Sequence, residues 1–162
     1  MKIRNVESKD LNEIMYIENM EFPPNEAASR VAMESRIELI PDTFLVACEG
    51  EKVLGYVVGP TSQSRYINDE LFENVAPNQE FHTTQTILSL ATASEEQGKG
   101  IATALLYELR KVAMLQGRKI ISLTCLKKLK SFYLYHGYKD EGISASTHGG
   151  ESWYNMILIL DK

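Results

Sequence analysis

Residues 95–106 have the sequence Glu-Glu-Gln-Gly-Lys-Gly-Ile-Ala-Thr-Ala-Leu-Leu, which is the sharpest local feature of the chain. Its two glycines, Gly98 and Gly100, allow the backbone to approach an anion closely. A helix that begins directly after them presents unpaired N–H groups and the positive end of its dipole at the same place. A glycine turn that leads into a helix in this way is typical of a phosphate-binding site.

The spacing of these glycines excludes two other phosphate sites. The stretch lacks the Gly-x-x-x-x-Gly-Lys-Ser/Thr pattern of the P-loop, and it lacks the third glycine of the GxGxxG dinucleotide site. By itself the stretch fits a plain tight turn equally well. The interpretation as a phosphate site gains weight from three groups of residues later in the chain, Lys127-Lys128, Phe132-Tyr133 and Gly137-Tyr138.

The elements around this turn alternate between helix and strand. Apolar residues at helical spacing predict a helix over Ile101–Leu115, which Gly117 ends. A strand over Phe81–Ala91, centred on Ile87, Leu88 and Leu90, precedes the turn. Further strands are predicted over Met1–Val6, Thr43–Glu49, Lys52–Val58, Lys119–Thr124, Tyr138–Ile143 and Trp153–Leu160, and further helices from Ser8 to Phe22, over Ala27–Ile40 and over Lys127–His136. Gly59–Gln79 is expected to be a long loop with a turn of helix near Asn68–Asn74. This order predicts an α/β fold around a mixed sheet.

The composition limits the classes of function. A length of 162 residues with 44% hydrophobic and 24% charged side chains predicts one globular domain over residues 1–162. A net charge of −5 argues against general nucleic-acid binding. The two cysteines, Cys48 and Cys125, form no CxxC or Cys/His cluster, so no metal site is expected. No run approaches the length of a membrane span and no signal peptide is apparent, so we expect a cytoplasmic protein.

Two motifs, one at residues 97–102 and one at residues 132–138, resemble those of the GNAT superfamily of acetyl-CoA-dependent N-acetyltransferases. Residues 97–102, Gln-Gly-Lys-Gly-Ile-Ala, fit the family's Gln/Arg-x-x-Gly-x-Gly/Ala motif. An alignment on the Gly98-x-Gly100 turn instead places Glu95 at the first position, which departs from the motif. Residues 132–138, Phe-Tyr-Leu-Tyr-His-Gly-Tyr, match the second landmark, Phe-Tyr-x-x-x-Gly-Phe/Tyr. The resemblance implies a GNAT-type fold with a mostly antiparallel twisted sheet flanked by helices.

Within the superfamily, the chain resembles the arylalkylamine (serotonin-type) N-acetyltransferase branch. Glu21–Ser29 is similar to the substrate-side loop of its microbial members, and Leu45–Gly59 is similar to the hairpin that follows. The resemblance implies direct transfer of an acetyl group from acetyl-CoA to a primary amine, most simply a small aryl/alkyl amine or a polyamine. Two alternatives stay open: acetylation of a peptide or protein amine, and a catalytically silent module that binds acyl-CoA. Homodimers are common in the superfamily, so a homodimer is compatible with the resemblance.

The resemblance also assigns the donor site. The CoA pyrophosphate would lie on backbone N–H groups of Gln97, Gly98, Lys99, Gly100, Ile101 and Ala102. The Lys99 side chain either adds charge there or is a solvated surface lysine. The pantetheine arm would run along Leu88, Ser89 and Leu90 like an added strand. The N–H of Leu88 or of its neighbour would then polarise the thioester carbonyl.

Catalysis needs a proton donor and a proton acceptor. Tyr133 occupies the family's tyrosine position and is the predicted general acid for the leaving thiolate. The His-x-His of the animal arylalkylamine enzymes falls on Thr84 and Thr86, which are not bases at neutral pH. His82 lies two residues away on the same strand face and is the candidate base. A water chain through the two threonines is an equal alternative.

The resemblance leaves the acceptor pocket least determined. It implies that Phe22, Pro24 and Trp153 wall an apolar slot for the amine, although each side chain also fits ordinary core packing. Glu26 could contact the ammonium group. Cys125 is interpreted as a packing residue, because direct transfer needs no nucleophile.

Overall fold

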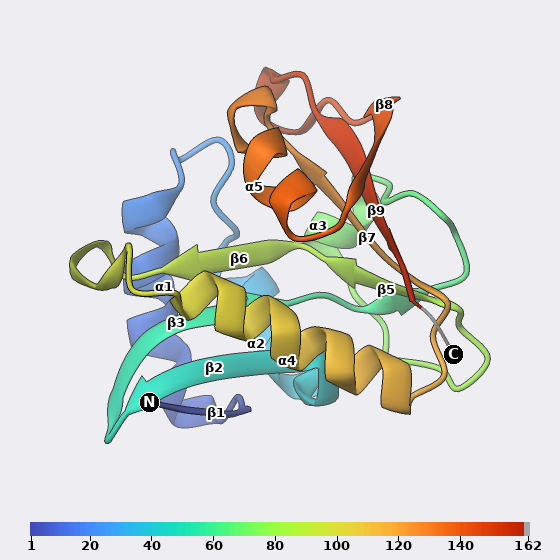
Figure 1. The fold of residues 1–162 in the computed structure, drawn as a ribbon. Coiled ribbons are helices and arrows are strands. Elements are labelled where there is room, and N and C mark those ends of the chain that lie inside the picture. Colours follow the sequence, from blue (N-terminus) through green and yellow to red (C-terminus); the bar gives the residue numbers. More distant parts are fainter. Residues whose placement is uncertain (161–162) are drawn as a thin grey trace.

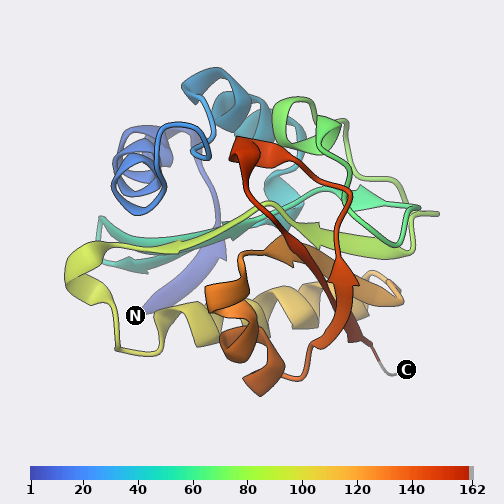
Figure 2. The same ribbon diagram turned by 90° about the horizontal axis from the view of Figure 1, so that it is seen from above.

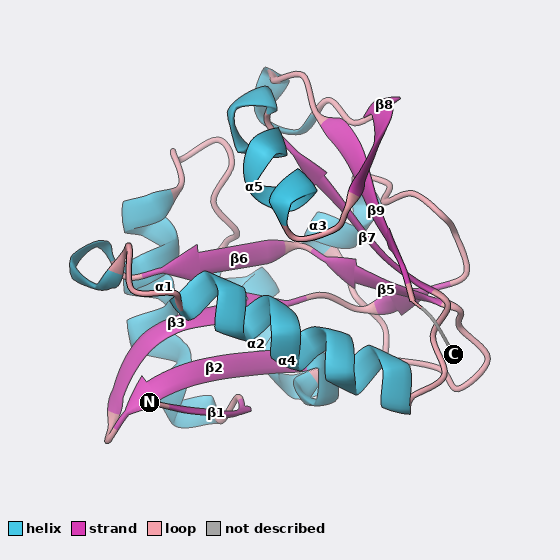
Figure 3. Cartoon of the chain, in the orientation of Figure 1, coloured by secondary structure: helices cyan, strands magenta, loops and turns pink. Residues whose placement is uncertain are grey.

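The strands form two sheets, and residues 84–92 run from one sheet directly into the other. The computed structural model describes residues 1–160. The first sheet is antiparallel, in the order β1 (Lys2–Asn5), β2 (Phe44–Glu49), β3 (Lys52–Val58) and β6 (Ser89–Thr92). The second has the order β4 (Thr61–Ser62), β5 (Thr84–Ile87), β7 (Ile120–Cys125), β9 (Tyr154–Ile159) and β8 (Lys139–Ile143), with β5 and β7 parallel (Figure 3). The mixed α/β fold is therefore confirmed, with its strands divided between two sheets.

Helices cover both faces of the first sheet. Helices α1 (Leu11–Glu21) and α2 (Arg30–Leu39) lie on one face and α4 (Ile101–Leu115) lies on the other (Figures 1 and 2). Strand β2 is buried on both sides, because Leu45 and Ala47 pack toward α4 while Phe44 and Val46 pack toward α1 and α2. This double burial explains the nearly continuous apolar run in β2. The short helices α3 (Glu70–Glu73) and α5 (Lys130–Tyr135) flank the second sheet.

The prediction of a single strand over Phe81–Ala91 was wrong in one respect. The chain changes sheets at Leu88, whose N–H donates to Val58 O at 2.7 Å. Strand β5 pairs with β4 and β7, whereas β6 pairs with β3. The ladder between β5 and β7 ends at the pair Ile87 and Leu123, and beyond it β6 and β7 diverge (Figure 1).

Other boundaries differ for local reasons. Helix α2 begins at Arg30 rather than Ala27, because the Ser29 hydroxyl accepts the Ala32 N–H at 3.1 Å and caps the helix. The loop over Gly59–Gln79 contains β4 as well as the expected turn of helix, α3. Lys127–Leu129 forms a 3-10 turn that leads into α5. Gly50, Gly98, Gly100 and Gly117 all have positive φ.

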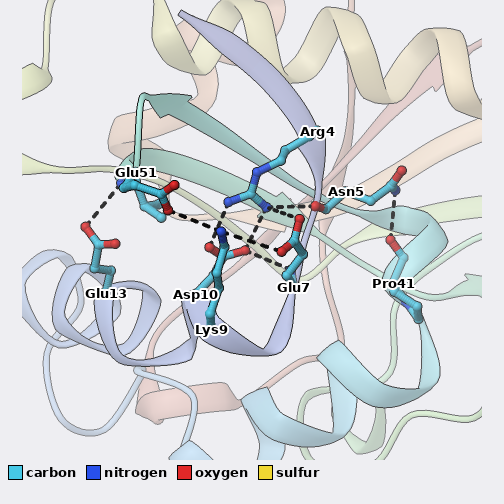
Figure 4. Close-up of polar contacts among 9 residues, drawn as sticks. Arg4, Asn5, Glu7, Lys9, Asp10, Glu13, Pro41 and Glu51 are labelled. Carbon is cyan, nitrogen blue, oxygen red and sulfur yellow. Dashed lines mark hydrogen bonds and ion pairs between the residues drawn. The ribbon is translucent and has the colours of Figure 1, made fainter.

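A bidentate ion pair fastens the N-terminal strand to the start of α1 (Figure 4). Both nitrogens Nη1 and Nη2 of Arg4 donate to the Asp10 carboxylate at 2.9 Å, and the Glu7 N–H donates to it at 2.8 Å. Asp10 is buried, and burial alone would raise its pKa. The hydrogen bonds from Arg4 and Glu7, together with the Arg4 charge, outweigh that effect and lower the pKa of Asp10.

Gly59 marks a close backbone approach where β3 ends and crosses β5. A Cβ atom at Gly59 would lie 2.0 Å from the carbonyl oxygen of Thr86, which is backbone and cannot rotate away. We expect Gly59→Ala to lower the free energy of unfolding by about 1–3 kcal/mol or more, measured by urea denaturation. Gly50→Asn is the control, because Gly50 meets nothing within 4 Å and asparagine tolerates positive φ. Equal stability of the two variants would contradict the close approach.

The Arg4–Asp10 pair predicts a pH-dependent stability. Asp10→Asn should lower the free energy of unfolding by about 1.5–3 kcal/mol at pH 7, because it removes a charge-assisted hydrogen bond. A carboxyl whose pKa is lowered by folding stabilises the protein above its unfolded pKa of about 3.9. The difference between wild type and variant should therefore shrink as the pH falls below that value. Glu51→Gln, at the exposed end of a Lys9 ion pair of 3.2 Å, is the control and should leave the stability nearly unchanged both at pH 7 and below the unfolded pKa of Asp10.

Candidate functional site

A cavity of about 1220 Å³ opens where β6 and β7 separate. One wall is β6, and the opposite wall is the segment 126–133. The glycine turn and the start of α4 line the mouth of the cavity. Loops after α1 and before β9 close the remaining side. The lining residues that bear on its chemistry are Phe22, Glu26, Leu90, Gly98, Gly100, Lys127, Lys128, Tyr133 and Trp153.

The glycine turn forms an open cradle at the beginning of α4. Gly98 and Gly100 have φ of 80° and 83°, a conformation that side-chain-bearing residues rarely adopt. A Cβ atom on either glycine would meet nothing within 4 Å, so the space above the turn is free. Among the described residues, the N–H groups of positions 98–100 have no acceptor. The 15-residue helix α4 adds its own unpaired N–H groups and dipole, so the cradle suits an anion.

The residues predicted for the donor side lie mostly together. Of the predicted turn residues, Gln97, Gly98, Gly100, Ile101 and Ala102 line the large cavity. Lys99 does not line it, and its Nζ lies 3.1 Å from Glu96 Oε1. Leu90 lines the large cavity as well.

A smaller cavity of about 80 Å³ continues from the inner end of the large one. The two share Phe22, Glu26, Leu90, Leu129, Tyr133 and Trp153. The smaller cavity adds Leu88 and Ser89, which are the other two predicted strand residues. A ligand that bound along β6 would therefore have its inner end in the smaller cavity.

Tyr133 lies between the two cavities on α5. Its ring makes edge contacts with Phe132 and Tyr138, with centroids 5.1 and 5.5 Å away. Burial raises the pKa of Tyr133, and the neighbouring Cys125 raises it further, so the phenol stays protonated at neutral pH. Its hydroxyl has no hydrogen-bond partner within residues 1–160 and is free to donate to a ligand.

Cys125 lines the smaller cavity at the end of β7. Burial raises the pKa of its thiol to about 11, with a further contribution from Asp140. The group is therefore a neutral thiol at physiological pH rather than the thiolate that a nucleophile requires.

Glu18 is a residue of this site that the sequence pattern did not predict. It is 2% exposed, yet it lines the smaller cavity from α1. Its carboxylate accepts the Tyr56 hydroxyl and, at 2.8 Å, the Ala28 N–H; the Ser89 hydroxyl lies 3.5 Å away. Burial and this carboxylate raise the pKa of Tyr56 well above its usual value. The available signal was a carboxylate on the apolar face of α1, one turn after Ile14.

His82, the predicted base, lies elsewhere. Its Nδ1 is 2.7 Å from Thr61 Oγ1, and its carbonyl accepts Arg118 Nη1 at 2.7 Å. Burial and the Arg118 charge lower the pKa of His82. The residue lines neither cavity. Thr84 and Thr86 are buried in β5, and the Thr86 hydroxyl donates to Pro60 O at 2.6 Å.

Of the residues predicted for the acceptor pocket, some line the two cavities and one does not. Phe22 and Trp153 line both cavities, and so does Glu26. Pro24 lines neither of them, and its neighbour Pro23 lines the large cavity instead.

Two general features of residues 1–160 complete the description of the site. No helix in this part of the chain is long and apolar enough to cross a membrane. No group of three or more histidine, cysteine, aspartate or glutamate side chains is placed there to hold a metal ion.

Comparison with known proteins identifies relatives of this arrangement. A model of the acetyltransferase (GNAT) family matches residues 11–138. No curated protein sequence matches the chain. Similar solved structures include Ard1 from Thermoplasma volcanium, with 18% identity and a TM-score of 0.79 over 99% of this chain and 98% of that one. The GNAT-like decarboxylase GphF in complex with isobutyryl-CoA has 16% identity and a TM-score of 0.81 over 99% and 100%. An aminoglycoside 6'-N-acetyltransferase complexed with coenzyme A has 14% identity and a TM-score of 0.75 over 100% and 98%.

Proposed function

The chain belongs to the acetyltransferase (GNAT) family, and we propose that it transfers an acetyl group from acetyl-CoA directly to a primary amine of a small molecule. One observation carries the proposal: the anion cradle at Gly98 and Gly100 opens into a cavity whose inner end holds Glu18 and Tyr133. An anion site, a channel and two proton-carrying groups are what a thioester donor and an amine acceptor require. The structure of GphF with isobutyryl-CoA and that of the aminoglycoside enzyme with coenzyme A support a CoA ligand.

The donor fits the residues present. Pyrophosphate would accept hydrogen bonds from N–H groups of the cradle and of the first turn of α4. Among residues 1–160, strand β6 pairs only with β3, so its other edge faces the gap and can bind an extended amide chain as an added strand. The Leu88 N–H is occupied by Val58 O, which excludes it as donor to the thioester carbonyl. Leu88 lies just before β6, so the alternation of N–H groups within β6 is counted from Ala93, whose N–H donates to Leu54 O. On this count the Leu90 N–H faces the gap, and in our proposal it donates to the thioester carbonyl.

Two side chains then move protons. Glu18 accepts a proton from the ammonium form of the acceptor, in place of His82, and the free amine attacks the thioester carbonyl carbon. The carbon–nitrogen bond forms as the carbon–sulfur bond breaks, and the Tyr133 hydroxyl gives its proton to the departing sulfur. The acylated nitrogen gives its extra proton to the Tyr133 phenolate, which leaves the neutral amide and restores the phenol. Glu18 releases the proton that it took from the ammonium group to solvent.

The acceptor in this proposal is a small aryl or alkyl amine, in line with the resemblance to the arylalkylamine branch. Phe22 and Trp153 supply aromatic walls, and Glu26 supplies a carboxylate near the amine. The aminoglycoside enzyme among the similar structures acts, by its name, on a small molecule that carries amino groups.

A thiol-release assay with acetyl-CoA over a panel of small amines tests the proposed function. The expected result is CoA release that depends on the amine, with the acetylated amine identified by mass spectrometry. Tight acetyl-CoA binding without turnover of any amine would instead favour a silent acyl-CoA-binding module. Turnover of peptides alone would favour a protein acceptor.

Gly100→Glu should abolish binding of CoA, measured by calorimetry. The substitution places a side chain in a left-handed position and adds a like charge to the cradle. Lys99→Ala is the control, because the Lys99 side chain pairs with Glu96 and Lys99 does not itself line the cavity, and the CoA affinity of this variant should stay within about threefold of wild type. Unchanged CoA affinity in Gly100→Glu would refute the cradle.

Tyr133→Phe and Glu18→Gln should each lower kcat by about 10²–10⁴-fold while the Kd for CoA changes little, because each removes a proton-transfer group and keeps the volume. His82→Gln should retain kcat if Glu18 is the base. A His82→Gln loss as large as that of Glu18→Gln would restore the histidine as the base. Circular dichroism of Glu18→Gln controls for folding, since Glu18 also bonds Tyr56 and Ala28.

A further inference from the structure

Three distant segments of the chain are tied together around the inner cavity. They are the loop 22–29, helix α3 and the segment 144–153, which gather on one side of the molecule (Figure 2). The Asp69 carboxylate, just before α3, accepts the Ser146 hydroxyl and, at 3.1 Å, the Thr147 N–H. Asn25 Nδ2 donates to Gly149 O at 2.8 Å. The segments are therefore joined by specific hydrogen bonds rather than by simple proximity.

His148 lies at the point where these three segments meet. Its ring stacks on Phe72 of α3, with centroids 4.5 Å apart and planes 9° apart. Its Nε2 donates to the carbonyl oxygen of Glu26 at 3.1 Å, which assigns the proton to that nitrogen. The indole Nε1 of Trp153 donates to His148 O at 2.7 Å. The imidazole is thus held by Phe72 and by Glu26, and the backbone of His148 is held by Trp153.

Phe72, on which the His148 ring stacks, is itself held by a residue of α2. Arg36, which is 1% exposed, donates from Nη2 to Phe72 O at 2.8 Å. A buried guanidinium that holds this carbonyl fixes α3, and with it the ring on which His148 stacks. The wall formed by Phe72 and His148 is consequently rigid at its base.

The size and charge of the enclosed space limit its occupant. A volume of about 80 Å³ is about half that of the roughly 150 Å³ engineered cavity that binds benzene, so the inner cavity holds only a few non-hydrogen atoms. Aromatic rings of Phe22, Phe72 and Trp153 form much of its wall, and Glu18 and Glu26 supply carboxylates. No lysine or arginine among residues 1–160 lines it. The space suits a cationic amino group and the one carbon that bears it, and the His148 side chain is part of the wall around them.

We infer that the acceptor is a primary amine carried on an unbranched carbon, and that His148 sets this limit on the substrate. The inference rests on the proposed function and adds a structural class to it. It separates amines of the type R–CH₂–NH₂ from amines whose nitrogen-bearing carbon has a second carbon substituent. Most peptide α-amino groups belong to the second class.

Matched pairs of amines that differ by one methyl group test the inference. Suitable pairs are benzylamine with α-methylbenzylamine, 2-phenylethylamine with its α-methyl derivative, and propylamine with sec-butylamine. Wild type should prefer the unbranched member by about 10–200-fold in kcat/KM, the range that one extra carbon produces in a tight pocket. Equal kcat/KM within the pairs would overturn the inference and leave the proposed function intact.

Variants then test the part played by His148. His148→Ala should bring the preference to within about threefold of unity, because the wall is removed. His148→Phe should keep most of the preference, because it retains a flat ring while losing the bond to Glu26. His136→Ala, which removes a histidine that bonds Thr103 and Phe132 O, is the matched control and should keep the wild-type preference.

The outcomes separate the two proposals. A wild-type preference that persists in His148→Ala would overturn the role of His148. If His148→Ala fails to fold by circular dichroism, loss of the preference in His148→Phe would overturn that role, and its retention would support the ring as the wall. Acetyl-CoA binding with no turnover of any amine would count against the proposed function itself.

Discussion

The change of hydrogen-bond partner at Leu88 determines where a ligand can enter this fold. Up to Ile87 the strand runs beside β7, and from Leu88 it belongs to the other sheet, because its N–H donates to Val58 O. Strand β7 continues without a break to Cys125, so the two strands must separate. The separation leaves one edge of β6 without a strand partner among the described residues and creates the large cavity in the same step. The glycine cradle can bind part of a ligand that enters this wedge-shaped cavity because it lies at the cavity's mouth.

The electrostatics of the wedge differ between its two ends. At the mouth, backbone N–H groups, a helix dipole and two lysines, Lys127 and Lys128, can meet an anion. Glu96 lines the same space, and its carboxylate is paired with Lys99 and Lys52. At the inner end, carboxylates of Glu18 and Glu26 line the wall. An acidic chain with a net charge of −5 can therefore hold a polyanion, since its own backbone supplies the donors. The same arrangement keeps negative charge at the end where a cationic amine would bind.

Much of the donor side could be predicted from the sequence because its determinants are local. The glycines, the helix over Ile101–Leu115 and the aromatic pair before Gly137 act within a few residues of themselves. What could not be predicted depends on distant contacts. The break at Leu88 requires Val58, and the burial of Glu18 beside the site requires Tyr56 and Ala28. His82 shares a strand face with Thr84, but its position is fixed by Thr61 and Arg118, which periodicity does not reveal. The exchange of Pro24 for Pro23 at the wall is a one-residue difference in a turn.

Glu18 links the stability of the fold to the chemistry proposed for it. Removing a carboxylate from water is costly, and hydrogen bonds from Tyr56 and Ala28 offset that cost. These bonds connect α1 to β3 and to the loop 22–29, so the inner cavity forms only when α1 is packed on the first sheet. The cradle, by contrast, needs only the turn and α4. The anion cradle is thus built by one stretch of sequence, whereas the proposed acceptor site is assembled from residues between Glu18 and Trp153. Changes in the connecting loops can therefore alter the acceptor while the donor site stays intact, which is how one fold can serve several acceptors.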